Sequence, residues 1–172
     1  MNINPKFGEY AVAATAFFVS VCSLFIYIYQ SKIMADQQQV AVWPRVQWSR
    51  SNVEGFQFNV ENKGVGPALV RKVQMSFNGQ PISGNAELVK AVMGEEPDIA
   101  WENSTLAGRA LSPGENVTLF KINDRAEGKL FNGKLREGKF AMDITYCSIY
   151  GRCWISSGFE AKRAPDDKSI DY

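Results

Sequence analysis

An uninterrupted apolar run from Tyr10 to Tyr29 constrains this chain more than any other feature of its sequence. The run contains no charged residue, no proline and no glycine. In an α-helix its residues rise by about 30 Å, which matches the hydrocarbon core of a bilayer. The sequence therefore predicts a transmembrane helix over residues 10–30, with a short cytoplasmic tail at residues 1–9 and a polar connector at residues 31–39.

The alternative to a retained anchor is a signal peptide that is removed. A signal core usually holds only about 7–15 apolar residues. The one A-x-A sequence, Ala14 to Ala16, lies inside the run rather than at its end. A lipoprotein signal through Cys22 is disfavoured too, because Val21 precedes the cysteine and the apolar run continues beyond it. An uncleaved signal anchor is therefore the prediction, with the lipid bilayer as the first expected partner.

The positive charges beside the run do not favour a cytoplasmic N-terminus. Lys6 lies before the run and Lys32 lies after it, whereas a cytoplasmic flank normally carries an excess of Lys and Arg. A short tail before a first apolar run usually stays in the cytoplasm while a large following domain is translocated. We therefore expect the C-terminal domain outside the cytoplasm.

The apolar run also contains a candidate helix-packing pair, Ala16 and Ser20. Small residues four positions apart let two transmembrane helices approach closely. The pair predicts contact with another membrane protein or with a second copy of this chain. The alternative is that these residues are scattered small side chains on a helix that faces lipid.

Residues 40–160 are predicted to form a domain of short strands. The pattern is clearest where Phe56, Phe58 and Val60 alternate with polar residues, a period of two that is typical of a half-buried strand. Seven or eight such strands favour a mainly β fold, an antiparallel immunoglobulin-like β-sandwich with one short helix. A polar C-terminal tail is expected at residues 161–172. The predicted core consists of Trp48, Phe56, Phe58, Met75, Phe77, Ile144, Tyr146 and Trp154.

Several local signals refine this domain. Asn78-Gly79 is the preferred pair of a two-residue type I′ hairpin, and Asn85 and Gly94 are suited to begin and stop a short helix. Apolar residues on both faces of residues 117–122 indicate a strand inside a sheet. The charged stretch from Asp124 to Gly138 contains three glycines, so we expect a loop with at most a helical turn there.

The last hairpin brings two cysteines together. If Ile149 to Gly151 form a three-residue loop with Gly151 in the left-handed conformation, Cys147 lies directly opposite Cys153. Cross-strand neighbours at this separation can form a disulfide. A structural disulfide is therefore predicted, and it indicates an oxidising compartment. In a cytoplasmic domain the alternative is two free thiols.

Three segments carry a resemblance to known proteins: residues 62–68, 111–115 and 144–151. In that order they resemble small uncharacterised bacterial membrane proteins with a single N-terminal span and a periplasmic immunoglobulin-like β-sandwich. The resemblance covers residues 8–158. It implies an inner-membrane, single-pass protein whose C-terminal domain lies in the periplasm, and it carries over no catalytic residue.

Composition excludes several classes of function. The chain has no histidine, and its 19 Lys and Arg nearly balance 18 Asp and Glu. Because the balance is near neutral and no basic stripe is present, nucleic acid is not an expected partner. Histidine is the commonest general base and metal ligand, and no nucleophile or phosphate-loop motif is present. We therefore expect no enzymatic activity, no metal and no cofactor.

The candidate interaction residues are Trp43, Tyr150 and Arg152, because rigid aromatic residues on loops suit protein contacts. For Trp43 the alternative is packing at the foot of the domain or on lipid headgroups. The sequence thus predicts a membrane-anchored, non-enzymatic protein that mediates protein–protein interaction, as an accessory subunit of a larger membrane complex. The alternative is a periplasmic sensor or binding module for a small ligand or a cell-wall fragment.

Overall fold

The computed structural model describes residues 5–94 and 98–165, and the chain divides after Ala41 into two compact units. Each unit is described by itself. Residues 1–4 of the predicted cytoplasmic tail and residues 166–172 of the predicted C-terminal tail lie outside the described residues.

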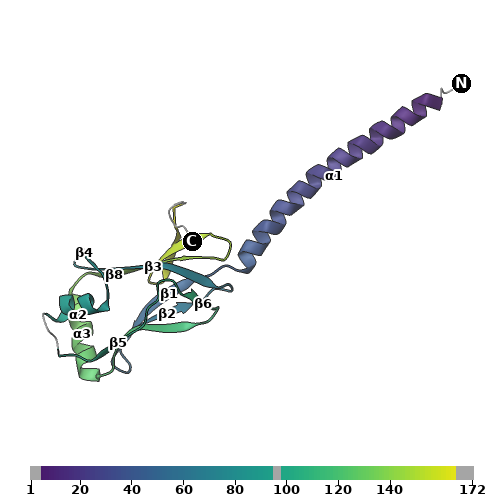
Figure 1. Ribbon diagram of the computed structural model, residues 1–172. Helices are drawn as coiled ribbons and strands as arrows, with labels where there is room; N and C mark the ends of the chain where they lie inside the picture. The colour runs from purple at the N-terminus through teal and green to yellow at the C-terminus, as the bar shows by residue number, and fades with distance from the viewer. Residues whose placement is uncertain (1–4, 95–97, 166–172) are drawn as a thin grey trace. The chain divides into compact units, whose positions relative to one another are not determined.

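The first unit is a single helix, α1, from Pro5 to Ala41 (Figure 1). Its segment Gly8–Ala41 is long and apolar enough to cross a membrane, a test that a signal sequence also passes. The helix continues through residues 31–39, where a connector was predicted, because most of these residues are good helix formers. It ends three residues before Pro44, and the residue before a proline avoids helical geometry.

The Ser and Thr hydroxyl groups of the apolar run are satisfied within α1. Thr15 donates to the carbonyl oxygen of Ala11, and Ser20 donates to that of Ala16, each at 2.8 Å. Ser23 makes the same bond, four residues back, to Val19. An unsatisfied polar group in hydrocarbon would cost several kcal/mol. These three side chains are therefore compatible with a helix that spans a membrane.

The second unit contains two antiparallel sheets (Figure 1). One sheet has the strand order β1-β2-β7-β5, and the other has the order β10-β9-β8-β3-β4, with β6 also paired to β3. The strands are β1 (Val46–Ser51), β2 (Phe56–Asn62), β3 (Ala68–Phe77), β4 (Gln80–Ile82), β5 (Trp101–Asn103), β6 (Ala110–Leu111), β7 (Asn116–Ile122), β8 (Phe140–Cys147), β9 (Cys153–Ser157) and β10 (Glu160–Arg163).

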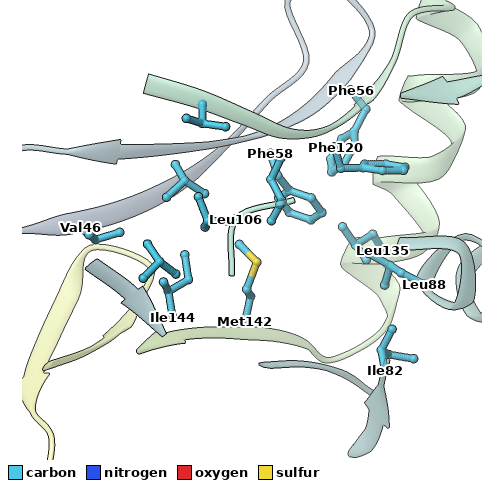
Figure 2. Packing of buried hydrophobic residues seen from close by; sticks show 14 of the residues in the cluster. Val46, Phe56, Phe58, Ile82, Leu88, Leu106, Phe120, Leu135, Met142 and Ile144 are labelled. Atoms are coloured by element: carbon cyan, nitrogen blue, oxygen red, sulfur yellow. The ribbon is translucent and has the colours of Figure 1, made fainter. Parts of the chain in front are cut away.

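One hydrophobic core joins the two sheets. Phe58 on β2 stacks on Phe140 of β8, with ring centroids 5.1 Å apart, and the indole nitrogen of Trp48 donates to the Met142 carbonyl at 2.9 Å. Figure 2 shows Met142 and Ile144 pointing from β8 toward Phe58. Four predicted core residues are buried: Phe56, Phe58, Ile144 and Tyr146. The other four pack against the core while partly exposed: Trp48, Met75, Phe77 and Trp154.

Several local predictions are confirmed. Strand β7 lies inside its sheet, between β2 and β5. The register of β3 against β8 shifts between Val70 and Lys72, an irregularity of the kind that a β-bulge makes. Asn78 and Gly79 have positive φ angles of 54° and 81°, as a type I′ turn requires.

Helix α2 (Asn85–Met93) occupies the range that was predicted, and Gly94 ends it with a positive φ angle. The predicted cap is wrong. Gly84 is the N-cap residue, and the Asn85 side chain is buried and donates to the Leu119 carbonyl at 3.3 Å. The Asn85 side chain therefore forms a buried hydrogen bond with β7 and does not cap α2.

A second helix, α3 (Arg125–Glu137), lies where a loop was predicted, so the expectation of one short helix in this domain is wrong. The Asp124 carboxylate caps it by accepting from the backbone of Ala126 and Glu127 at 2.8 and 2.9 Å. Phe131 and Leu135, four residues apart, are buried in the core. Tertiary packing thus outweighs the low helix propensity of the glycines.

The described chain is mixed rather than mainly β. Helix α1 alone has 37 residues and α3 adds 13, so helix and strand are nearly equal. Strand β10 continues to Arg163 and Ala164 is buried, so ordered structure passes the predicted domain end at residue 160. The backbone of Ala164 donates to the Cys153 carbonyl at 3.0 Å, which ties this end of the chain to β9.

Candidate interaction surface

The two ends of the second unit are built differently. Strand β2 begins at Phe56, whose ring lies 4.9 Å from that of Phe131 on α3. It ends at Asn62, and three loops lie at this end of the unit: residues 42–45, 62–67 and 148–152. The third loop belongs to this end because Leu69, at the start of β3, pairs with Cys147 at the end of β8. We call this set of loops the loop end.

The buried side chain of Asn62 holds two of these loops together. Its Oδ1 atom accepts from the backbone of Arg45 and Gly64 at 3.1 and 3.0 Å. Its Nδ2 atom donates to the carbonyls of Gly66 and Leu111 at 2.8 and 3.0 Å. All four hydrogen-bonding positions of the amide are therefore used, and they fix residues that lie up to 49 positions away in the sequence.

Two glycines let the first loop lie directly against the second. A Cβ atom on Gly66 would approach the Val42 carbonyl oxygen to 2.0 Å, and one on Gly64 would approach the Trp43 carbonyl oxygen to 2.4 Å. The Trp43 carbonyl also accepts from the backbone of Val65 at 3.0 Å. Close backbone contact thus fixes the positions from which the Trp43 and Val65 side chains project.

The predicted disulfide joins Cys147 to Cys153 across the β8–β9 hairpin. The loop between them has the predicted geometry, because Gly151 has a φ angle of 77°. Ser148 donates from its backbone to the Arg152 carbonyl at 2.8 Å, and Gly151 donates to the Ser148 carbonyl at 3.0 Å. The loop is therefore fixed covalently and by its own hydrogen bonds.

Apolar side chains project from the loop end. Ile149 and Tyr150 at the hairpin tip are 49% and 48% exposed, and Trp43 is 45% exposed. Val65, on the neighbouring loop, is also exposed. A rigid tip exposes these side chains without the entropy that a flexible loop loses on binding. The loop end is therefore the candidate interaction surface, with Trp43 and Tyr150 where the sequence predicted exposed aromatics.

Packing of aromatic side chains stabilises the β8–β9 hairpin next to this surface. Tyr146 is fully buried and stacks on Trp154 with ring centroids 5.9 Å apart. Burial raises the pKa of the Tyr146 hydroxyl, and the Val46 backbone and the charge of Arg45 oppose this shift. The phenol is thus protonated at neutral pH. The side chain of Arg152, the third predicted interaction residue, is half-buried rather than projecting as Tyr150 does.

The predicted packing pair belongs to α1, in the first unit. Ala16 and Ser20 are exposed on the helix, and the Ser20 hydroxyl is bonded to the Ala16 carbonyl. This bond leaves the pair free of polar requirements. Any contact that the pair makes with another helix therefore rests on shape.

Two ion pairs lie near the loop end. Lys63 lies 2.8 Å from Glu61, and Arg109 lies 2.9 Å from Glu115. Within the described ranges no group of three or more His, Cys, Asp or Glu residues is placed to hold a metal ion. What the loop end offers chemically is an apolar contact surface, with Arg45, Lys63 and Arg152 as the charged residues of its loops.

No family model matches this chain, and no curated protein or solved structure is detectably similar to it.

Sequence reasoning missed three parts of the loop end. It included Ile149 in the hairpin loop without marking it as an exposed contact residue, and it considered Val65 only as part of residues 62–68, which carry the resemblance. It also gave Asn62 no role of its own, although the Asn62 side chain forms hydrogen bonds with residues of two loops. The sequence does contain a signal for Asn62: an asparagine ends an alternating strand, and two closely spaced glycines follow it.

Removing the disulfide by Cys147→Ser with Cys153→Ser is expected to lower the free energy of unfolding by about 2 kcal/mol, because the closed loop is short. The paired strands are expected to keep the native fold, so the circular dichroism spectrum stays unchanged. Urea unfolding of the full chain in detergent micelles measures the effect. Cys22→Ala is the matched control. Equal stability of the double variant and this control would contradict the prediction.

Proposed function

We propose that this chain is a membrane-anchored, non-enzymatic protein whose loop end binds another membrane protein, as an accessory subunit of a larger complex. One observation carries the proposal: a disulfide-closed tip presents Ile149 and Tyr150, and Trp43 and Val65 project from the same end. Aromatic side chains held on rigid loops contribute strongly to protein contacts. Grouped exposed apolar side chains are typical of interaction sites.

The domain is proposed to be an immunoglobulin-like sandwich. Its order β1-β2-β7-β5 corresponds to strands A-B-E-D of that fold, and β9-β8-β3-β4 corresponds to G-F-C-C′. Two departures are clear. The disulfide links the F and G equivalents within one sheet, and a helix connects the E and F equivalents. Domains of this architecture commonly use end loops for recognition.

The proposed location is a bacterial inner membrane with this domain in the periplasm. Support comes from the bilayer-length apolar helix and from the disulfide, because disulfides persist in oxidising compartments. In intact cells a membrane-impermeant thiol reagent is expected to label Cys147 and Cys153 only after reduction. Labelling without reductant would contradict both the compartment and the bridge.

Tyr150→Ser is expected to reduce co-purification of the bound protein at least about tenfold, as loss of a central aromatic contact does. The measurement is affinity purification of the full chain, at native expression level, in mild detergent. Leu130→Ser is the matched control, because Leu130 is an equally exposed apolar residue on α3, at the other end of β2.

Three outcomes would contradict the proposed interaction. The first is recovery of the chain without any other protein. The second is an equal loss in both variants. The third is a co-purifying set that Tyr150→Ser leaves unchanged while Trp43→Ser removes only bound lipid, which would assign the loop end to membrane headgroups.

A further inference from the structure

Helix α1 carries a seven-residue repeat of β-branched side chains. The positions are Val12, Val19, Ile26, Ile33 and Val40, each seven residues after the one before. Taking them as position a of a heptad, position d holds Thr15, Cys22, Tyr29 and Asp36. A repeat of seven is the period at which two helices wind around each other in a left-handed supercoil. The repeat runs through both the apolar run and the polar segment after it.

Two shallow hollows lie on the surface of α1, and they occupy the same heptad positions. The first is lined by Ala11, Val12, Thr15, Ala16, Val19 and Ser20. The second is lined by Ile33, Asp36, Gln37, Val40 and Ala41, three heptads later. On a straight helix three heptads drift by roughly 60°, and supercoiling removes this drift. A second helix that winds around α1 would therefore fill both hollows along one seam.

We propose that α1 forms a parallel two-stranded coiled coil with α1 of a second copy of this chain. This inference rests on the membrane-anchor part of the proposed function, because two copies inserted in the same direction have parallel helices. Val and Ile at position a are typical of parallel two-stranded coiled coils. The apolar lining of the hollows suits a partner with the same stripe.

The area of the seam is sufficient for a specific dimer. The position-a side chains are 41–70% exposed on the isolated helix. Covering them together with the d side chains removes roughly 1,000–1,500 Å² from solvent and lipid over both copies, within the size range of specific interfaces. In the polar segment, burial of Ile33 and Val40 is driven by the hydrophobic effect. Within the bilayer the contact depends on packing.

The two charged residues near the seam balance each other within each copy. Between residues 10 and 41 the only charged residues are Lys32 and Asp36, four positions apart. Two copies bring two carboxylates near the seam together with two ammonium groups one turn away, so the local charge balances. A polar residue at a core position lowers stability and fixes the register of the two strands. Asp36 therefore aligns the copies in register.

Cys22 provides a direct test, because it is a free cysteine at position d and would face Cys22 of the second copy. Oxidation of native membranes with copper phenanthroline is expected to give a product of twice the chain mass, and Cys22→Ala is expected to abolish it. On the Cys22→Ala background, Ile26→Cys at position a is expected to restore the product. Leu24→Cys, which faces away from the seam, is expected to yield at least about fivefold less.

Leu24→Cys also distinguishes this seam from a contact in which two helices pack through the Ala16–Ser20 face. Leu24 continues the Ala16–Ser20 row by four residues, so a crossing on the small-residue face would cross-link Leu24→Cys best. That result would overturn the coiled coil. Equal yield at every position, no product at any position, or a product of a different mass would overturn it as well.

Extraction of the same membranes with alkaline carbonate separates the two proposals. If the chain remains in the membrane without cross-linking through Cys22 or Ile26→Cys, the dimer is wrong and the anchor stands. If the chain is released from the membrane, the anchor is wrong, and the parallel dimer that depends on it is wrong too.

Discussion

Asn62→Asp is expected to lower the free energy of unfolding by about 3–5 kcal/mol, because it removes two buried hydrogen-bond donors and adds a buried charge. In the native protein Nδ2 donates to the carbonyls of Gly66 and Leu111. A carboxylate oxygen at that position would face two carbonyl oxygens without a proton to share. The loops that carry Trp43 and Val65 lose the group that holds them together.

The deficit of Asn62→Asp is expected to depend on pH. Two facing carbonyls and burial favour the protonated acid, so the pKa of the new carboxyl in the folded state lies above its unfolded value. A group with a raised folded pKa contributes most at low pH, and its contribution is lost as the pH rises through the folded pKa. The difference in stability from the native protein therefore shrinks as the pH is lowered toward 4.

Urea unfolding of the full chain in detergent micelles, followed by tryptophan fluorescence, measures both effects. The matched control is Asn59→Asp, on the same strand. Asn59 is half-buried and accepts from the Thr118 hydroxyl through Oδ1 at 3.1 Å, a role that a carboxylate retains. The control is expected to change stability by less than about 1 kcal/mol. Equal effects of the two substitutions would contradict the role given to Asn62.

The hairpin around the disulfide could be predicted from the sequence because its determinants are local. Alternation on β8 sets which residues share a face, and a three-residue loop ending in Gly151 sets the register. Together they place Cys147 opposite Cys153, as the structure has them. A strand and its turn contain all the information that this prediction requires.

The remainder of the loop end depends on residues that are distant in the sequence. Asn62 meets the Leu111 carbonyl across 49 positions, and Gly66 meets Val42 through backbone atoms. Neither contact leaves a periodic pattern. The sequence therefore predicted Trp43 and Tyr150 as separate exposed aromatics, and it is the fold that brings their loops to one end of the domain.

Helix α3 was not predicted, because Gly128 and Gly133 lower its intrinsic helix propensity. Two signals in favour of a helix are present in the same segment: the N-cap residue Asp124 and the buried pair Phe131 and Leu135, four positions apart. Gly128 is buried where α3 crosses the start of β2, so its lack of a side chain is a packing requirement. Gly133 has no atom within 4 Å of a Cβ position. The two glycines of one helix therefore have opposite roles.

Gly128→Ala is expected to lower the free energy of unfolding by about 3 kcal/mol, because the backbone of β2 leaves no room for a methyl group. The new Cβ atom would lie 2.5 Å from the backbone nitrogen of Phe56 and 2.8 Å from the carbonyl carbon of Gly55, so α3 must move away from the core. Gly133→Ala is the matched control, and it is expected to raise stability by about 0.5–1 kcal/mol through helix propensity alone.

Thermal unfolding of the full chain in micelles distinguishes the two variants, since about 1 kcal/mol shifts the midpoint of a domain of this size by roughly 3–4 °C. Opposite shifts are expected, a fall of about 10 °C for Gly128→Ala and a small rise for Gly133→Ala. If both substitutions raised the midpoint, α3 would not be seated on β2 through Gly128. Because α3 packs at the Phe56 end of β2, Gly128→Ala is expected to leave the Cys147–Cys153 disulfide intact. Mass analysis after thiol alkylation measures whether the disulfide is present. An intact disulfide would show that the substitution changes the packing of α3 and not the hairpin.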